Sequence, residues 1–259
     1  MTDEAYARAA TLRSSTGELE RRAADAPKPP SLAAALARKD VAVIAEVKRS
    51  SPSKGAINLD LQLDSQIRAY ERGGAAAVSI LTEPTRFSGS NHDLESACAI
   101  ASIPLLKKDF HVDPLQIIEA RALGASAALV IARAVGPDRM RTLLETAREV
   151  GLETLVEIRD EAELNLALRL GAEIVGVNNR NLETLEIDPT TSSRLIPLIP
   201  RGVIAVAESG VKSVEDVRAL GQAGADAVLV GSSISASPNP EDSVRSLTGV
   251  TRSAGARKS

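Results

Sequence analysis

The sequence predicts an α/β fold of the (β/α)8 TIM-barrel type, preceded by a short N-terminal helical extension. Glycine–alanine steps, each followed by a strand of small apolar residues, begin at Gly74, Gly124, Gly171 and Gly224, at intervals of 50, 47 and 53 residues. A further apolar strand and helical patterns lie between these steps, so each period holds two strand–helix units. Four periods, counted from the first strand, give about eight units, as in this barrel. An open doubly wound sheet is the competing fold, but no Gly-x-Gly-x-x-Gly follows any strand.

The N-terminal region precedes the predicted barrel. Residues 3–23 suit a polar amphipathic helix, which the small residues at 14–17 interrupt. A proline-rich segment at 26–30 predicts a stiff connector. Ser31 is then expected to cap a short helix that runs to Arg38. We assign residues 1–40 to the extension, 41–248 to the barrel and 249–259 to a polar tail, with no second domain.

The barrel elements follow from apolar runs and helical periodicity. Strands are expected at residues 41–45, 75–80, 103–106, 153–158 and 203–207, and after the glycine–alanine steps at 124, 171 and 224. Helices are expected at residues 61–72, 113–123, 137–150, 160–170 and 213–222. These five helices follow five of the eight expected strands, as connections between parallel strands require.

Composition excludes several classes of function. A net charge of -3 gives no general attraction to nucleic acid or to anionic lipid. Cys98 has no second cysteine to pair with and fits a reducing cytosol, and His92 and His111 lack metal-ligand spacing, so no metal is expected. No apolar run is long enough for a membrane span, and the acidic N-terminus does not resemble a signal peptide. We expect a cytoplasmic monomer without a nucleic-acid or membrane partner.

Charged side chains follow the predicted strands at their carboxyl ends. After the first strand, Glu46 and Lys48 share one face with Ile44, because side chains alternate along a strand. The other strand ends carry charged, amide or small residues: Lys107, Lys108 and Asp109; Glu157; Asn178, Asn179 and Arg180; Glu208, Ser209 and Gly210; Gly231 and Ser232. Chemistry in this barrel takes place at that end. A single residue of this kind suits a solvated strand end, but so many together indicate a site.

Small residues at the last two strand ends predict a phosphate site. Ser209-Gly210 and Gly231-Ser232 allow backbone N–H groups to approach an anion closely. A phosphate site after strands seven and eight recurs in these barrels. Ser51 or Lys54, in the loop after the first strand, could add contacts.

Two phenylalanines, Phe87 and Phe110, stand out because the chain has no Trp and only two Tyr. Both fall just past strand ends and outside the predicted strands and helices. A ring at the mouth of the barrel could stack on an aromatic ligand, or it could be a hydrophobic plug that excludes water. The sequence leaves both interpretations open.

From about Pro29 to Ser237 the chain resembles indole-3-glycerol phosphate synthase, the barrel enzyme that closes the indole ring in tryptophan biosynthesis. The matching segments are residues 46–55, 81–83, 108–110, 156–157, 176–182, 207–210 and 231–233. The resemblance implies the substrate 1-(2-carboxyphenylamino)-1-deoxyribulose 5-phosphate. It also implies the products indole-3-glycerol phosphate, carbon dioxide and water, with no cofactor. The short N-terminal segment, which lacks a Lys/Arg-rich opening helix, departs from the family.

The resemblance assigns roles residue by residue. Lys108 is implied as the general acid on the substrate ketone, since alternation alone does not say whether Lys107 or Lys108 faces inward. Lys48 is implied as the partner of the aromatic carboxylate, of Glu46 and of Glu157. Glu157 is implied as the acid/base group for dehydration, Asn178 as the residue that holds the ribulose hydroxyls, and Arg180 as a supporting residue. Glu46 and Glu208 are implied to complete the polar ring. The residues implied to hold the phosphate are Ser51, Ser209, Gly210, Gly231 and Ser232, and those implied to line the ring pocket are Phe87, Phe110, Leu129, Ile131, Leu182 and Leu229.

Two other functions compete with this interpretation. Phosphoribosylanthranilate isomerase, a neighbouring barrel in the pathway, needs a Cys/Asp pair at strand ends, whereas Cys98 lies in a predicted helix. A degenerate barrel that only binds a phosphorylated aromatic molecule is the second. The intact set of Lys48, Lys108, Glu157 and Asn178 argues against it.

Overall fold

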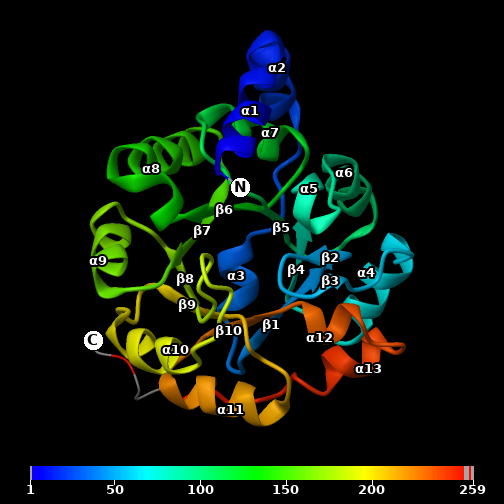
Figure 1. The fold of residues 1–259 in the computed structure, drawn as a ribbon, viewed down its shortest axis with the longest axis vertical. Helices are drawn as coiled ribbons and strands as arrows, with labels where there is room; N and C mark the ends of the chain where they lie inside the picture. Colours follow the sequence, from blue (N-terminus) through cyan, green and yellow to red (C-terminus); the bar gives the residue numbers. More distant parts are fainter. Residues whose placement is uncertain (1, 254–256, 258–259) are drawn as a thin grey trace.

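The computed structural model describes residues 2–253 and 257, and within them eight parallel strands close into a barrel (Figure 1). The strands are β1 (Ala42–Val47), β4 (Ala77–Leu81), β5 (Leu105–Lys108), β6 (Ala127–Ile131), β7 (Glu153–Ile158), β8 (Ile174–Asn178), β9 (Ile204–Glu208) and β10 (Ala227–Val230). Neighbours follow the chain around the barrel, and β1 closes it by pairing with both β4 and β10. The predicted fold class is confirmed.

Helices surround the barrel on the outside (Figure 1). Those of the barrel are α4 (Leu63–Arg72), α5 (Pro84–Phe87), α6 (Asn91–Ile100), α7 (Pro114–Ala122), α8 (Ala132–Glu149), α9 (Glu161–Arg169), α10 (Thr190–Leu195), α11 (Val214–Ala223), α12 (Ser232–Ser235) and α13 (Pro240–Arg245). A 3-10 turn, η2 (Ile196–Leu198), continues α10, and the hairpin β2 (Ser50–Ser51) and β3 (Gly55–Ala56) lies in the loop after β1.

Local chemistry explains where these helices begin and end. Asp113 and Ser213 each form a capping box at the start of a helix, because their side chains accept the backbone N–H groups that a first turn leaves free. Gly224 ends α11 in the left-handed conformation. Helix α8 starts before the predicted Pro137 and is kinked at Gly136, where φ is 71°.

Two apolar layers hold the barrel together. Inward-facing residues such as Ile44, Leu106 and Leu155 form an interior cluster, and the alternate residues pack between the strands and the helices. The alternation in β1 is clear, since Val43 and Val47 belong to the outer layer. It places the inward residues at the carboxyl ends of the strands around the barrel axis.

The N-terminal extension forms three helices, two of which take the place of the interrupted helix expected over residues 3–23. Helix α1 (Thr2–Leu12) and α2 (Thr16–Asp25) are separated by a 3-10 turn, η1 (Arg13–Ser15), within the stretch of small residues. Helix α3 (Leu32–Leu36) begins as expected, with Ser31 accepting from Ala34 N, but it ends at Leu36 and not at Arg38.

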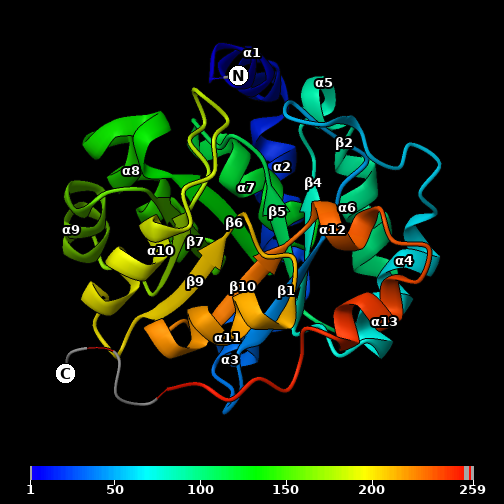
Figure 2. The same ribbon diagram turned by 60° about the horizontal axis from the view of Figure 1, so that its bottom comes forward.

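These helices occupy both ends of the barrel. Figure 2 places α1 beside α5 at the carboxyl ends of the strands, and α3 at the opposite end. Helix α2 packs along α7. Leu32 and Leu36 of α3 are fully buried in the interior cluster, so α3 closes the amino end of the barrel.

The chain returns along the amino end after α13. Asp226, buried at the start of β10, pairs with both Arg252 and Arg257 and accepts a 2.7 Å hydrogen bond from Ala205 N. Residues 254–256, 258 and 259 of the predicted polar tail lie outside the described residues. No helix in the described part of the chain is long and apolar enough to cross a membrane.

Candidate active site

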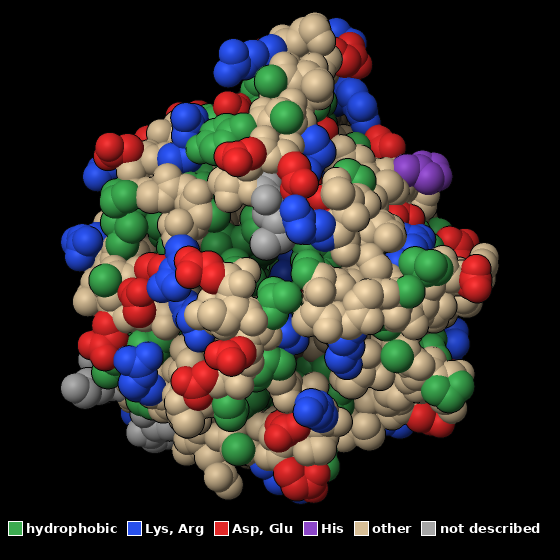
Figure 3. All heavy atoms as spheres, viewed as in Figure 1, with side chains coloured by type: hydrophobic (Ala, Val, Ile, Leu, Met, Phe, Trp, Pro, Cys, Tyr) green, Lys and Arg blue, Asp and Glu red, His purple; other side chains and the backbone are tan. Residues whose placement is uncertain are grey.

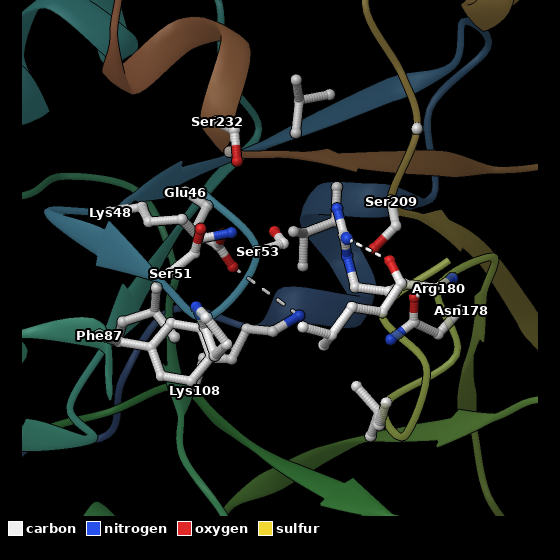
Figure 4. A pocket seen from close by; sticks show the side chains of 18 of the residues that line it. Glu46, Lys48, Ser51, Ser53, Phe87, Lys108, Asn178, Arg180, Ser209 and Ser232 are labelled. Carbon is white, nitrogen blue, oxygen red and sulfur yellow. Dashed lines mark hydrogen bonds and ion pairs between the residues drawn. The ribbon is translucent and has the colours of Figure 1, made fainter. Parts of the chain in front are cut away.

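A cavity of about 610 Å³ opens at the carboxyl ends of the strands. Figure 3 shows hydrophobic side chains gathered around the central hollow of this face, and Figure 4 shows charged side chains converging inside it. Every residue expected in the site lines this cavity except Glu208, which is buried beneath it and contacts Lys108. Side chains from all eight strand ends or the loops that follow them are therefore gathered in one place.

Lys108 ends β5 with its ammonium between two carboxylates at the floor of the cavity. Its Nζ lies 3.8 Å from Oε2 of Glu46 (Figure 4). It also lies 2.7 Å from Oε2 of Glu208, and both acids are 1% exposed. Burial alone would lower the pKa of Lys108, but Glu208, Glu46 and Glu157 outweigh it and raise that pKa above its usual range. The lysine is thus held in its charged form.

The adjacent lysine faces the other way. Lys107 is 1% exposed and pairs at 2.5 Å with Glu119 of α7, on the outer side of the strand. The structure therefore settles which of the two lysines reaches the cavity. The inward one is Lys108, as the resemblance implied.

Glu46 and Lys48 form an ion pair at the end of β1. Burial would raise the pKa of Glu46, yet the charges of Lys48 and Lys108 hold it below its usual value. Tyr70 of α4 and Ser235 of α12 both donate to the carbonyl oxygen of Glu46, at 3.1 and 2.7 Å. These buried hydrogen bonds fix the end of β1. The expected pairing of Lys48 with Glu157 is wrong, since no such ion pair occurs among the described residues.

The surroundings of Glu157 raise the pKa of its carboxyl group. It ends β7 inside the cavity and is 4% exposed. Burial, and then the nearby negative charge of Glu208, raise the pKa of Glu157 to about 7. Glu157 can therefore give or take a proton near neutral pH, next to a lysine that stays charged.

The loop after β8 forms one wall of the cavity. Asn178 ends the strand, and its Oδ1 accepts a 2.9 Å hydrogen bond from the backbone N–H of Arg180. The Arg180 guanidinium donates at 2.7 Å to the carbonyl of Leu185, which has a φ of 63°. Arg180 thus braces this loop, along which Leu182, Leu185 and Ile187 face the cavity.

Small residues form the rim at β9 and β10. Ser209 and Gly210 follow β9 with φ of 65° and 93°, and Asn179 anchors this turn by donating at 3.0 Å to the Ser209 carbonyl. Gly231 and Ser232 follow β10, and Ser51 faces them from the loop after β1 (Figure 4). Small residues and hydroxyls from three loops therefore line the same side of the cavity, an arrangement that suits anion binding.

The two phenylalanines lie at the mouth with different supports. Phe87 is the last residue of α5, so the expectation that it lies outside any helix is wrong. The Glu83 carboxylate caps this short helix and accepts from the backbone N–H of Phe87 at 3.2 Å. Phe110 follows β5 and is 9% exposed in the interior cluster. Both rings line the cavity.

Helix α1 contributes a contact that sequence reasoning missed. Arg8 pairs with Asp109 at 2.5 Å and with Glu83 at 3.7 Å, and so joins the extension to the ends of β5 and β4. Asp109 also accepts from Thr82 Oγ1 at 2.8 Å and from Phe110 N at 2.7 Å. The only signal in the sequence was the place of Asp109 directly after Lys108.

No group of three or more metal-ligating side chains occurs among the described residues. Cys98 lies within α6 and does not line the cavity, which removes the thiol that the isomerase alternative needs. A closed eight-stranded barrel with a buried ammonium, several acids and an anion rim at its carboxyl end defines a barrel enzyme for a small anionic substrate.

Comparisons with known proteins identify the family within this class. The sequence model described as indole-3-glycerol phosphate synthase matches residues 3–247, and the chain belongs to this family. Indole-3-glycerol phosphate synthase of Mycolicibacterium smegmatis is 46% identical over 233 residues, covering 90% of this chain and 86% of the relative. Indole-3-glycerol phosphate synthase 2 of Streptomyces coelicolor is 47% identical over 227 residues, covering 88% of each.

A solved structure supports the fold alone. Thiamine phosphate pyrophosphorylase from Pyrococcus furiosus superposes with a TM-score of 0.61 at 13% identity, over 81% of this chain and 94% of that one. The family defines the reaction. The chain is a carbon–carbon lyase of tryptophan biosynthesis that converts 1-(2-carboxyphenylamino)-1-deoxyribulose 5-phosphate into indole-3-glycerol phosphate, carbon dioxide and water.

Proposed function

We propose that Lys108 is the general acid of the ring closure and that the surrounding acids keep it charged for this task. The aromatic ring carbon attacks the substrate ketone, a carbon–carbon bond forms, and negative charge develops on the ketone oxygen. A proton from the Lys108 ammonium converts this oxygen to a hydroxyl. The observation that carries the proposal is the position of this ammonium, at the cavity floor between Glu46 and Glu208.

Glu157 serves the later steps. Loss of carbon dioxide from the cationic ring intermediate leaves the electron pair in the ring. Elimination of water then needs a base for a substrate proton and an acid for the departing hydroxyl. A carboxyl group with a pKa of about 7 can act in either form at neutral pH, which supports this role for Glu157.

The other residues bind and orient the substrate. Lys48, beside Glu46, is the cation for the aromatic carboxylate, and Asn178 is placed for the ribulose hydroxyls. The phosphate occupies the rim that Ser51, Gly210 and Ser232 share with Ser209 and Gly231. Phe87, Phe110, Leu129, Ile131, Leu182 and Leu229 enclose the aromatic ring, and Arg180 supports this wall through Leu185.

A carboxylate-dependent binding experiment tests this arrangement. Lys48→Gln is expected to raise the KM of the substrate about 10-fold or more, since a charge-assisted contact contributes about 1.5–3 kcal/mol. The affinity for a reduced substrate analogue without the aromatic carboxylate should change less than 3-fold, an expectation that follows from removing that one contact. Equal weakening of both ligands would contradict the assignment of Lys48.

We propose a monomer that acts in the cytoplasm, where the lone Cys98 stays reduced. Light scattering on the purified protein and fractionation of the source cells test these two statements. A dimeric mass, or recovery of activity outside the cytoplasmic fraction, would contradict them.

A further inference from the structure

Two glycines at the floor of the barrel leave room for the acids beside Lys108. A Cβ atom added to Gly176 of β8 would lie 2.1 Å from Oε1 and 3.2 Å from Cδ of Glu208. A Cβ atom added to Gly231 would lie 2.3 Å from Oε1 of Glu46. Real Cβ atoms essentially never show contacts under 3.0 Å, so each acid occupies space that a side chain would otherwise fill.

The backbone does not explain why residue 176 is a glycine. Gly176 lies within the regular part of β8, paired with Glu157 on one side and Val206 on the other, and it is not among the residues with positive φ. Glycine inside a strand costs roughly 0.5–1 kcal/mol, because it loses more conformational freedom and packs no side chain. A glycine here therefore indicates close approach of another group, and that group is the Glu208 carboxylate.

The geometry shows what this space does for Glu208. The acid comes from the end of β9, one strand further on, and its register partner on β8 is Asn178. Its carboxylate lies over Gly176, in the layer of Glu157, with Oε2 toward Lys108. Oε1 has no hydrogen-bond partner of standard geometry among the described residues, and the groups that limit its position are the backbone at Gly176 and the neighbouring carboxyl group of Glu157.

We propose that Gly176 is a positioning residue for the ring closure. Because it has no side chain, it leaves the space in which the Glu208 carboxylate lies against the Lys108 ammonium. The inference rests on the roles proposed above for Lys108 and Glu208. Gly231 provides the matching space for Glu46 on the other side of the ammonium. The two glycines together fix both acids around one cation.

Gly176→Ala isolates this effect because it keeps every charged group. The obstacle to the new methyl group is the end of a flexible side chain, so the acid moves while the backbone stays. Restoring an ordinary contact of 3.4 Å or more from 2.1 Å displaces the carboxylate by over an ångström and breaks its 2.7 Å contact with Lys108. The Leu155 side chain, whose Cδ1 would lie 3.3 Å from the methyl group, needs to move only slightly.

Gly176→Ala should lower kcat about 10- to 100-fold, the usual cost of misplacing a catalytic group by about 1 Å, with little change in KM. Because Glu208 raises the pKa of both Lys108 and Glu157, both limbs of the pH–kcat profile should move to lower pH. The matched control is Gly202→Ala, whose Cβ would have nothing within 4 Å and which should behave as wild type. Wild-type kcat and an unmoved pH profile in Gly176→Ala would overturn the inference.

A double-mutant cycle shows whether the effect passes through Glu208. In a Glu208→Ala background the collision is gone, so Gly176→Ala should have no further effect on kcat. An equal loss in both backgrounds would contradict the inference. If Gly176→Ala does not fold, the double variant should fold. Failure of both variants to fold would contradict the inference that Gly176 leaves space for Glu208. Wild-type turnover in Glu208→Ala would instead refute the proposed role of Glu208 itself.

Discussion

The buried carboxyl group of Glu157 makes the stability of the protein depend on pH in a direction that the structure fixes. The pKa of Glu157 is raised from 4.5 to about 7 in the folded protein, so the folded state binds this proton more tightly than the unfolded state. The stabilising contribution is complete below the unfolded pKa and is lost as the pH rises through the folded pKa. Glu157→Gln, which removes the titrating group, should abolish this component.

The magnitude follows from the shift. A change of one pKa unit corresponds to about 1.4 kcal/mol, so the contribution of Glu157 is about 3 kcal/mol, most of it lost between about pH 5 and about pH 8. The free energy of unfolding, measured in urea at several pH values, should therefore fall by about 3 kcal/mol more in wild type than in Glu157→Gln across this range.

Taking the difference between the two proteins removes the other titrating groups. His111 acts in the opposite direction, because burial lowers its pKa to about 4 and its contribution grows as the pH rises. It is present in both proteins and cancels, provided that the substitution leaves its surroundings unchanged. Parallel stability curves for wild type and Glu157→Gln would refute the reasoning.

Three further predictions concern other parts of the molecule. Arg8→Ala should raise the KM of the substrate several-fold and lower kcat, because Asp109 and the α5 cap lose their link to α1; steady-state kinetics equal to those of wild type would count against this. Ser232→Ala should lower the affinity for inorganic phosphate about 10-fold in a calorimetric titration, because a hydrogen bond to a charged group is lost; an unchanged affinity would show that Ser232 is not part of the phosphate site. Asp226→Ala should cost about 3–5 kcal/mol of stability in urea unfolding, because two arginines lose their buried partner. Its kcat at low temperature should stay unchanged, and a stability loss below 1 kcal/mol would contradict the importance of this cluster.

Much of the architecture could be predicted from the sequence because the barrel repeats one local pattern. The apolar strands and the helical patterns that begin at Asp113 and Ser213 are local signals, and the structure places these elements within a few residues of the expected bounds. The position of charged residues at strand ends also predicted which end of the barrel carries the cavity, since parallel strands bring their carboxyl ends together.

Other features depend on contacts that no local pattern records. Whether Lys107 or Lys108 faces inward depends on the phase of the pleat, and a shift by one residue exchanges the two faces. Arg8 meets Asp109 across 101 residues, and the place of α1 over the barrel mouth follows only from tertiary packing. The space that Gly176 leaves for Glu208 could not be predicted either, because it depends on a contact between neighbouring strands. In the sequence, Gly176 is simply one more small residue of a strand.

The central claim concerns the ammonium at the cavity floor, and one variant tests it most directly. Turnover of 1-(2-carboxyphenylamino)-1-deoxyribulose 5-phosphate by wild type and by Lys108→Ala is followed through the fluorescence of the indole product, with inorganic phosphate binding as the check that the barrel is intact. We expect kcat to fall about 10²- to 10⁴-fold in the variant while phosphate still binds. Undiminished turnover in a folded Lys108→Ala variant would contradict the account.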